Sequence, residues 1–214
     1  MAVTGVGGAD NPSRLERRKH RTRSSLVRAG QQLLAEGRTS VSVLDITNLA
    51  DVGNGSFYNH FASKDELFEA AVLAVLDDHG AVMDSLTADL PDPAEAFTQS
   101  FRLTGRLHRR FPQMSRVVVN RGIGMASADA GLIPRARRDI EAAVRAQRFD
   151  AEDVDVAVAI VAGAALSLAV LLHAEPERDD ASTTDQVTKH VLRSLGVVDS
   201  EIARLLALPL PELT

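Results

Sequence analysis

Residues 54–60 carry the side chains best suited to chemistry in this chain, and that chemistry is contact with nucleic acid. Phe57 and Phe61 are four residues apart, so they would share one face of a helix and leave their neighbours to project elsewhere. The projecting side chains are polar or aromatic: Asn54, Ser56, Tyr58, Asn59 and His60. Asparagine can pair with adenine through two hydrogen bonds. The pattern therefore predicts a short helix that packs by one face and meets DNA by the other.

A second short helix is predicted just before this one. Ser42 can cap its first turn, and Asp45 follows at the spacing of a reciprocal cap. Three apolar residues then fall on one buried face: Val43, Ile46 and Ala50. The helix should end near residues 51–53, Asp-Val-Gly, because Asp tolerates left-handed backbone angles and Gly adopts them freely. Two short helices joined by such a turn form a helix-turn-helix.

A third helix is predicted to start directly after residues 54–60, which we call the reading segment. Ser63 and Glu66 have the spacing of a capping box, and the helix would carry apolar residues inward: Phe68, Ala71, Val72 and Val75. Lys64 would then lie at a helix start, where backbone amides already favour an anion. The natural anion at this position is a DNA phosphate.

The sequence of residues 26–72 resembles the DNA-binding domain of the tetracycline-repressor (TetR) family. The resemblance rests on Ser-Val-x-Asp-Ile, the turn, and then Gly-Ser-Phe-Tyr-Asn-His-Phe-Ala-Ser-Lys-Asp-Glu-Leu. The chain departs from the usual family pattern at four positions: Thr47, Asp51, Gly53 and Asn54. Asp51 and Gly53 still permit the turn, so the departure at Asn54 bears on base preference and not on fold.

The resemblance implies roles for individual residues. Phosphate contacts are implied for Tyr58, His60 and Lys64. Contacts with the DNA backbone near the start of the preceding helix are implied for Thr39 and Ser42. The residues implied to face bases are Asn54, Gly55, Ser56 and Asn59. It also implies that the last two long helices, residues 154–173 and 184–195, form a four-helix interface in a homodimer.

Composition bounds the remaining possibilities. The chain has 214 residues and no cysteine, which excludes disulfides, cysteine-ligated zinc and thiol catalysis. The first residues lack the apolar core of a secretory signal, so a cytoplasmic protein is expected. Net charge is +2 over residues 1–68 (9 basic, 7 acidic) and −7 over residues 69–214 (15 basic, 22 acidic).

Basic charge gathers just ahead of the proposed reader. Seven basic residues and one acid, Glu16, lie within residues 14–28: Arg14, Arg17, Arg18, Lys19, Arg21, Arg23 and Arg28. By itself such a run could be a solvated helix start or a flexible tail. Beside a helix-turn-helix, phosphate contact is the favoured interpretation.

The rest of the chain predicts helices only, so the fold class is all-α. Helices are expected at about residues 17–36 with Gly37 as C-terminal cap, 66–79, 94–111, 134–148, 154–173, 184–195 and 199–206, with a glycine-rich loop at 122–131. The predicted organisation is a disordered tail (1–13), a three-helix DNA-binding domain (14–65) and a larger ligand-binding and dimerisation domain (66–214).

Residues 156–172 contain no charge, so a membrane span must be weighed against a buried helix. The stretch is short for a span, rich in alanine and preceded by acidic residues, which favours a buried helix and no membrane. A helix that is apolar nearly all round must be covered on every side, and part of the cover could be a second copy of the chain.

An effector site is predicted in the C-terminal half. Phe97, Phe101, Thr104 and His108 fall on one helical stripe that is apolar at one end and polar at the other. Met114, with Val117 and Val118, could add apolar wall, and Asn120 or Arg121 could bind an acidic group. The alternative is an ordinary core stripe that ends in a surface histidine. The six histidines show no ligand spacing, so neither a metal nor a cofactor is predicted.

These features predict a ligand-responsive repressor that binds a palindromic operator in double-stranded DNA as a homodimer and is released by an unidentified small molecule. Activation in place of repression stays open. Two other classes were weighed: a helical small-molecule-binding or scaffold protein with a non-functional reader, and an all-helical enzyme. The enzyme is disfavoured because no nucleophile with a paired base, carboxylate pair or phosphate-binding glycine loop is evident.

Overall fold

The computed structural model describes residues 13–121 and 131–211, and every regular element among them is a helix. In chain order these are α1 (Arg14–Ala35), α2 (Val43–Leu49), the 3-10 helix η1 (Asn54–Asn59), α3 (Lys64–Thr87), α4 (Pro93–Arg110), α5 (Pro112–Arg121), α7 (Ile133–Arg145), α8 (Val154–Ala174), α9 (Asp180–Ser194) and α10 (Asp199–Ala207). The predicted all-α fold class is confirmed. The predicted tail, except Ser13, and the glycine-rich loop, except Gly131, lie outside the described residues.

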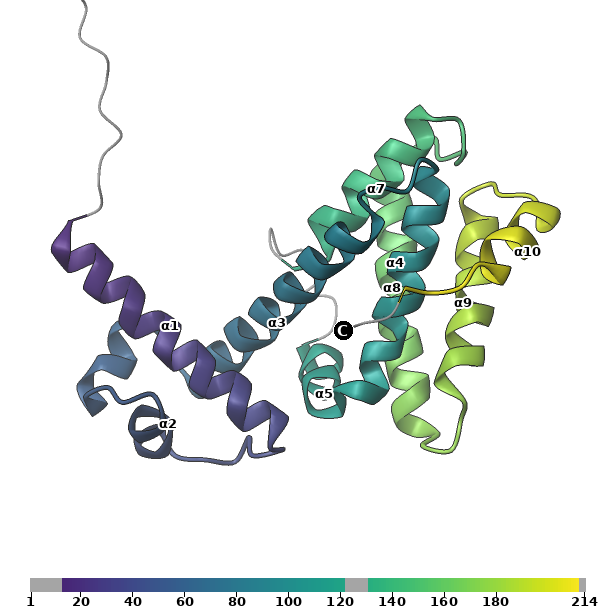
Figure 1. Ribbon diagram of the computed structural model, residues 1–214. Coiled ribbons are helices and arrows are strands. Elements are labelled where there is room, and N and C mark those ends of the chain that lie inside the picture. Colours follow the sequence, from purple (N-terminus) through teal and green to yellow (C-terminus); the bar gives the residue numbers. More distant parts are fainter. Residues whose placement is uncertain (1–12, 122–130, 212–214) are drawn as a thin grey trace, which may run out of the picture.

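The helices form two groups that α3 joins. Figure 1 shows α1 and α2 at one end and α4, α7, α8, α9 and α10 at the other, with α3 running from the first group into the second. Because α3 is one continuous helix of 24 residues, it is about 36 Å long and takes part in both groups.

Helix α1 begins slightly earlier than the sequence pattern predicted. The Ser13 hydroxyl accepts a hydrogen bond from the Glu16 amide at 3.1 Å, and the Glu16 carboxylate accepts one from the Ser13 amide at 2.6 Å. This reciprocal cap places the helix start at Arg14. At the other end Gly37 has φ 72°, so the predicted glycine cap is confirmed.

Helix α3 extends past the predicted end near His79 and stops only at Thr87. The prediction was wrong here because Gly80 has a packing role instead of ending the helix. A Cβ at Gly80 would lie 2.5 Å from Cδ of Arg135, whose side chain crosses α3 at this point. Glycine therefore allows α7 to bring an arginine across the middle of α3.

The core of the N-terminal group continues into the bundle. Phe57, Phe61 and Leu67 are buried in one cluster together with Leu107 of α4 and Met114 of α5. The predicted domain boundary at residue 65 consequently falls inside a packing unit, because the first turns of α3 belong to the core of the DNA-binding group.

The bundle has a separate core centred on α4, α7, α8 and α9. Phe97 stacks on Phe101, and Phe149 meets Phe97 edge-on with the ring centroids 5.2 Å apart. Helix α9 starts before the predicted residue 184, because the Asp179 carboxylate caps the Ser182 amide.

Helix α8 is covered on one side only within the single chain. Val158, Val161 and Leu168 are buried, whereas Val156 is 54% and Val170 49% exposed. This is the one helix among residues 13–121 and 131–211 that is long and apolar enough to cross a membrane by length and composition. Because α8 packs against α4, α5, α7 and α9, we interpret it as a helix of the bundle core.

Candidate DNA interface and ligand cavity

The reading segment η1 is fixed by two aromatic side chains and directs its polar residues outward. Phe57 and Phe61 are 0% and 1% exposed, whereas Tyr58 is 66% exposed and rests edge-on against Phe57 with the centroids 5.3 Å apart. The other residues implied to face DNA are exposed or half-buried: Asn54, Gly55, Ser56, Asn59 and His60. One face of η1 holds the domain and the opposite face is open to a partner.

In the turn that precedes η1, only the aspartate adopts the left-handed backbone conformation that the sequence pattern allows for both Asp51 and Gly53. Asp51 has φ 53°, in the left-handed region, whereas Gly53 has φ −62° and an ordinary extended conformation. The predicted turn position is correct, and Asp51 is the residue that makes it.

Gly55 is a glycine that the fold itself does not require. No atom lies within 4 Å of the position that a Cβ would occupy, and its backbone has no positive φ. Glycine is also used where a backbone must approach a ligand closely, and the open space at Gly55 is compatible with such an approach.

The start of α2 is a closed capping box. The Ser42 hydroxyl accepts from the Asp45 amide at 3.1 Å, and the Asp45 carboxylate accepts from the Ser42 amide at 3.0 Å. Hydrogen bonds from the side chain and backbone of Ser42 hold the pKa of Asp45 below its usual range. Ser42 is thus engaged as a cap, while neighbouring Thr39 is exposed.

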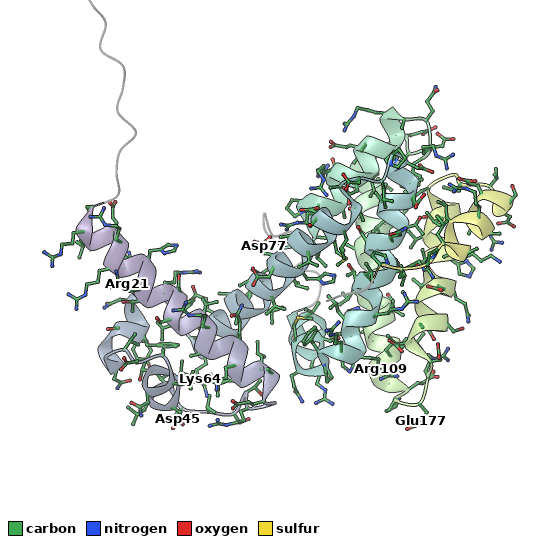
Figure 2. The ribbon with its side chains drawn as sticks, in the orientation of Figure 1. Arg21, Asp45, Lys64, Asp77, Arg109 and Glu177 are labelled. Carbon is green, nitrogen blue, oxygen red and sulfur yellow. The ribbon has the colours of Figure 1, made fainter. Side chains whose placement is uncertain are left out.

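Lys64 ties α3 to the loop before α2. Its Nζ donates a hydrogen bond of 2.7 Å to the Val41 carbonyl, and two further ammonium protons remain for other acceptors. Ser63 caps α3 as predicted, but the Glu66 carboxylate accepts from the Ala62 amide instead of the Ser63 amide. Figure 2 labels Lys64 close to where α1 passes α3.

The basic run of α1 lies beside the reading segment. The Arg23 guanidinium sits over the Phe61 ring, 5.1 Å from its centroid, and all seven basic side chains of residues 14–28 are exposed. Burial lowers the pKa of His60, and the charges of Lys19 and Arg23 lower it further. Sequence patterns indicated basic charge near the reader but not which cations contact it.

A cavity of about 90 Å³ lies between α3, α4, α7 and α8. Its lining is mostly apolar and includes Phe97, Phe101 and Val161, with polar side chains that include Ser100, Thr104 and Asp139. A second cavity of about 320 Å³ shares Asp84 and Asp139 with it. An apolar pocket with a few polar groups is the usual form of a small-molecule site.

Both halves of the chain match models of one family. The model for bacterial regulatory proteins of the tetR family matches residues 26–71, and that for the tetracyclin repressor-like C-terminal domain matches residues 92–207. The chain belongs to the TetR family. It is accordingly a DNA-binding transcriptional regulator, and its family and fold are those of regulators and not of enzymes.

Individual relatives agree with the TetR assignment. YxbF of Bacillus subtilis (strain 168), an uncharacterized HTH-type transcriptional regulator, is 30% identical over 84 residues, a match that spans 37% of this chain and only 22% of that relative. RolR in complex with resorcinol superposes with a TM-score of 0.71 and 27% identity over 93% of this chain and 100% of that one. FadR from Bacillus subtilis in complex with stearoyl-CoA shares the fold, with a TM-score of 0.59 and 12% identity over 79% of this chain and 97% of that one.

The effector residues predicted for this TetR-family chain divide into two groups. Phe97, Phe101 and Thr104 line the cavity together, and the Thr104 hydroxyl lies 3.4 Å from Nε2 of His79. Met114 does not line it, because it is buried in the core shared with the DNA-binding group. Arg121 ends α5, and its side chain, like those of Val117 and Asn120, lies outside the described residues.

His108 is also engaged away from the cavity lining. It is 9% exposed, and its Nδ1 lies 2.9 Å from the Ser115 hydroxyl, which is itself 2.8 Å from Nε2 of His173. This contact joins α4, α5 and α8. His108 is therefore an interior residue that does not line this cavity, and the alternative of a surface histidine at the end of the stripe is also wrong; the pattern on α4 alone could not reveal this.

Proposed function

We propose that this regulator represses transcription as a homodimer in the cytoplasm, binding a palindromic operator and releasing it when a small molecule occupies the cavity. The observation that carries the proposal is the outward polar face of η1, held by buried Phe57 and Phe61 beside the exposed cations of α1. Base contacts would come from Asn54, Gly55, Ser56 and Asn59, and phosphate contacts from Tyr58, His60, Lys64, Thr39 and Ser42.

The exposed side of α8 supports the homodimer. Val156, Ile160 and Val170 recur along one face of α8, and a Cβ at Gly163 would meet no atom within 4 Å. An apolar face of this kind is usually covered by a partner, and a twofold axis through it would also bring α9 of both subunits together. Two reading segments placed about one DNA turn apart then read two half-sites.

The cavity supports control by a small molecule. It lies where α3 meets the bundle, and α3 begins at Lys64, directly after the reading segment. RolR, a relative of similar architecture, was solved with resorcinol bound. A ligand that prefers one orientation of α3 would change operator affinity by as much as it prefers that orientation, and DNA would weaken ligand binding equally.

Selection of bound sequences from a randomised duplex pool tests the DNA-binding part. A palindrome with half-sites centred about 10 base pairs apart, or a multiple of one turn, is expected. Recovery of no enriched sequence by folded protein would contradict the proposal.

Sedimentation tests the dimer. Ile160→Arg places a charge on the exposed face of α8 and should yield monomers, while Val82→Arg at an exposed apolar position of α3, outside the proposed interface, should not. A wild-type chain that sediments as a monomer at micromolar concentration would exclude the α8 interface.

A further inference from the structure

The size of the cavity limits its guest to about one ring. At about 90 Å³ it lies well below the 300–1,000 Å³ of pockets for drug-sized ligands. An engineered cavity of about 150 Å³ holds benzene, so a single ring needs only a small outward movement of the walls. A long acyl chain would exceed this volume.

The apolar walls of the cavity suit a flat guest. The Phe97 and Phe101 rings are 6.2 Å apart with an interplanar angle of 24°, and both border the cavity from α4. Small side chains of α8, Ala162 and Ala165, form the opposite wall. Aromatic side chains favour offset or edge contacts with another ring.

The polar end of the cavity is a paired network of opposite charges. Arg135 donates to Asp84 at 3.0 Å and to Asp77 at 2.6 Å, and Arg138 donates to Asp84 at 2.6 Å and to Asp139 at 2.7 Å. Three members of this network, Asp84, Arg135 and Asp139, line the cavity. The hydroxyls of Ser100 and Thr104 also border it.

The charges of this network argue against an ionic guest. Burial raises the pKa of Asp139, and the hydrogen bond from Arg138 only partly offsets it. Both guanidiniums are already bonded to carboxylates, so an added carboxylate would find no unused cation and would lose its hydration. An added ammonium would also lose its hydration, and each carboxylate that it could meet is already bonded to an arginine. A neutral hydroxyl can donate to a carboxylate oxygen and accept from Ser100, Thr104 or a guanidinium.

We infer that this cavity binds a compact, uncharged aromatic ring that carries hydroxyl groups, with the ring against Phe97 and Phe101 and the hydroxyls on the network of Asp84, Arg135 and Asp139. This inference rests on the proposed function for its regulatory meaning, and it makes the network the determinant of specificity. Arg135 donates to Asp77 and Asp84, which lie on α3 on either side of Gly80. Hydroxyls of the guest that bond to Asp84 or Arg135 would compete with these two hydrogen bonds. The guest thereby acts on the helix that leads to Lys64.

Calorimetry of the ligand-free protein with four probes tests the inference without DNA. Resorcinol and phenol should bind, resorcinol more tightly, whereas benzoate and benzylamine should bind at least about ten-fold more weakly than resorcinol, as expected for an uncompensated charge. Tighter binding of benzoate or benzylamine, or of a medium-chain fatty acid, would overturn it.

Two variants locate the site. Asp139→Asn should weaken resorcinol by about ten-fold, because the acceptor loses its charge, while Asp199→Asn on α10 should leave it unchanged. Ala162→Leu fills the cavity and should abolish binding of both phenols. Thermal unfolding verifies that each variant is folded, and unchanged resorcinol binding in folded Asp139→Asn and Ala162→Leu would refute the assignment.

Operator affinity of the ligand-free protein is measured separately, so the two hypotheses fail separately. Loss of operator binding with intact resorcinol binding would refute the proposed function, and the reverse result would refute the assigned guest. Resorcinol that binds in the cavity but leaves operator affinity unchanged would refute its role on α3.

Discussion

The arginines of the bundle and those of α1 differ in what they contact. In the bundle, Arg102 is 7% exposed and donates to Asp185 and to the Leu208 carbonyl. Arg109, labelled in Figure 2, donates to the carbonyls of Leu172 and Glu175 at the end of α8, each at 2.7 Å. The cations of α1, such as Arg21 in Figure 2, are exposed. The same residue type holds helices together at one end of the molecule and offers charge to a partner at the other.

The comparison explains why net charge alone misleads for this chain. The second part of the sequence is acidic overall, and arginines such as Arg102, Arg135 and Arg148 are paired with carboxylates, which cancels their charge locally. The first part has a small positive balance, but seven of its nine cations are exposed side chains of α1, beside η1. Exposure and position therefore decide which part meets DNA.

Removing a bundle arginine should have the largest effect on stability. Arg102→Ala leaves Asp185 with only the longer contact to Arg106 at 3.4 Å, and it should lower the free energy of unfolding by about 3 kcal/mol, measured by denaturant titration. The matched control is Arg193→Ala, whose pair with Asp199 is exposed and should contribute less than about 1 kcal/mol. Equal losses in the two variants would contradict the distinction.

Acid should destabilise the bundle before it affects the reader. Burial, and then the neighbouring His173, lowers the pKa of His108 to about 4, while the unfolded chain titrates near 6.5. The unfolded state therefore takes up the proton first, so stability is full above pH 6.5 and falls by about 3 kcal/mol as the pH drops to 4.

Unfolding measured across this pH range checks the prediction. His108→Gln should remove only part of the dependence, because burial also lowers the pKa of His79 to about 4, and His60→Gln, at the half-buried edge of η1, should change it less. An unchanged slope in folded His108→Gln would exclude His108 as its source.

Removing cations of α1 should have the opposite outcome to Arg102→Ala, with little loss of stability and a clear loss of DNA affinity. Arg18→Ala with Arg21→Ala should leave unfolding within about 0.5 kcal/mol of wild type, because exposed side chains far from the core contribute little. Operator affinity should fall by about ten-fold. The slope of log affinity against log salt concentration should decrease by the amount expected for about two lost phosphate contacts. Binding assays at several salt concentrations measure both, and a loss confined to one operator sequence would contradict phosphate contact.

Gly55→Ala should give the smallest change in the fold and a selective change in binding. An added methyl group meets open space in the free protein, so thermal unfolding should be equal or slightly raised. Affinity for the operator should fall several-fold because the methyl group would meet DNA. Full affinity in this variant would show that the backbone of η1 does not approach the duplex closely.

The local features of the fold could be predicted because single residues decide them. Ser42 and Asp45 fix the start of α2, Gly37 ends α1, and the spacing of Phe57 and Phe61 gives the buried face of η1. Each of these depends on a few neighbouring residues in the chain, which a sequence pattern can register.

The features that failed depend on residues far apart in sequence. The predicted helix end near His79 was wrong, and the arginine that packs over the helix there at Gly80, Arg135, comes from another helix. The burial of His108 was not predicted either for an effector residue or for the alternative of a surface group, because Ser115 and His173, which enclose it, come from α5 and α8. The ion-pair network at the cavity likewise joins α3 to α7, so no local pattern indicated it.

The continuity of core from Phe57 to Met114 has a consequence for engineering. A chimeric regulator made by grafting residues 14–65 onto another bundle would lose Leu67, Leu107 and Met114, which belong to the hydrophobic core of the grafted segment. A junction after Thr87, together with transfer of the residues of α4 and α5 that face this core, keeps the core complete. If the outward residues of η1 contact bases as proposed, operator specificity is accordingly easier to exchange by substituting these residues than by transplanting residues 14–65.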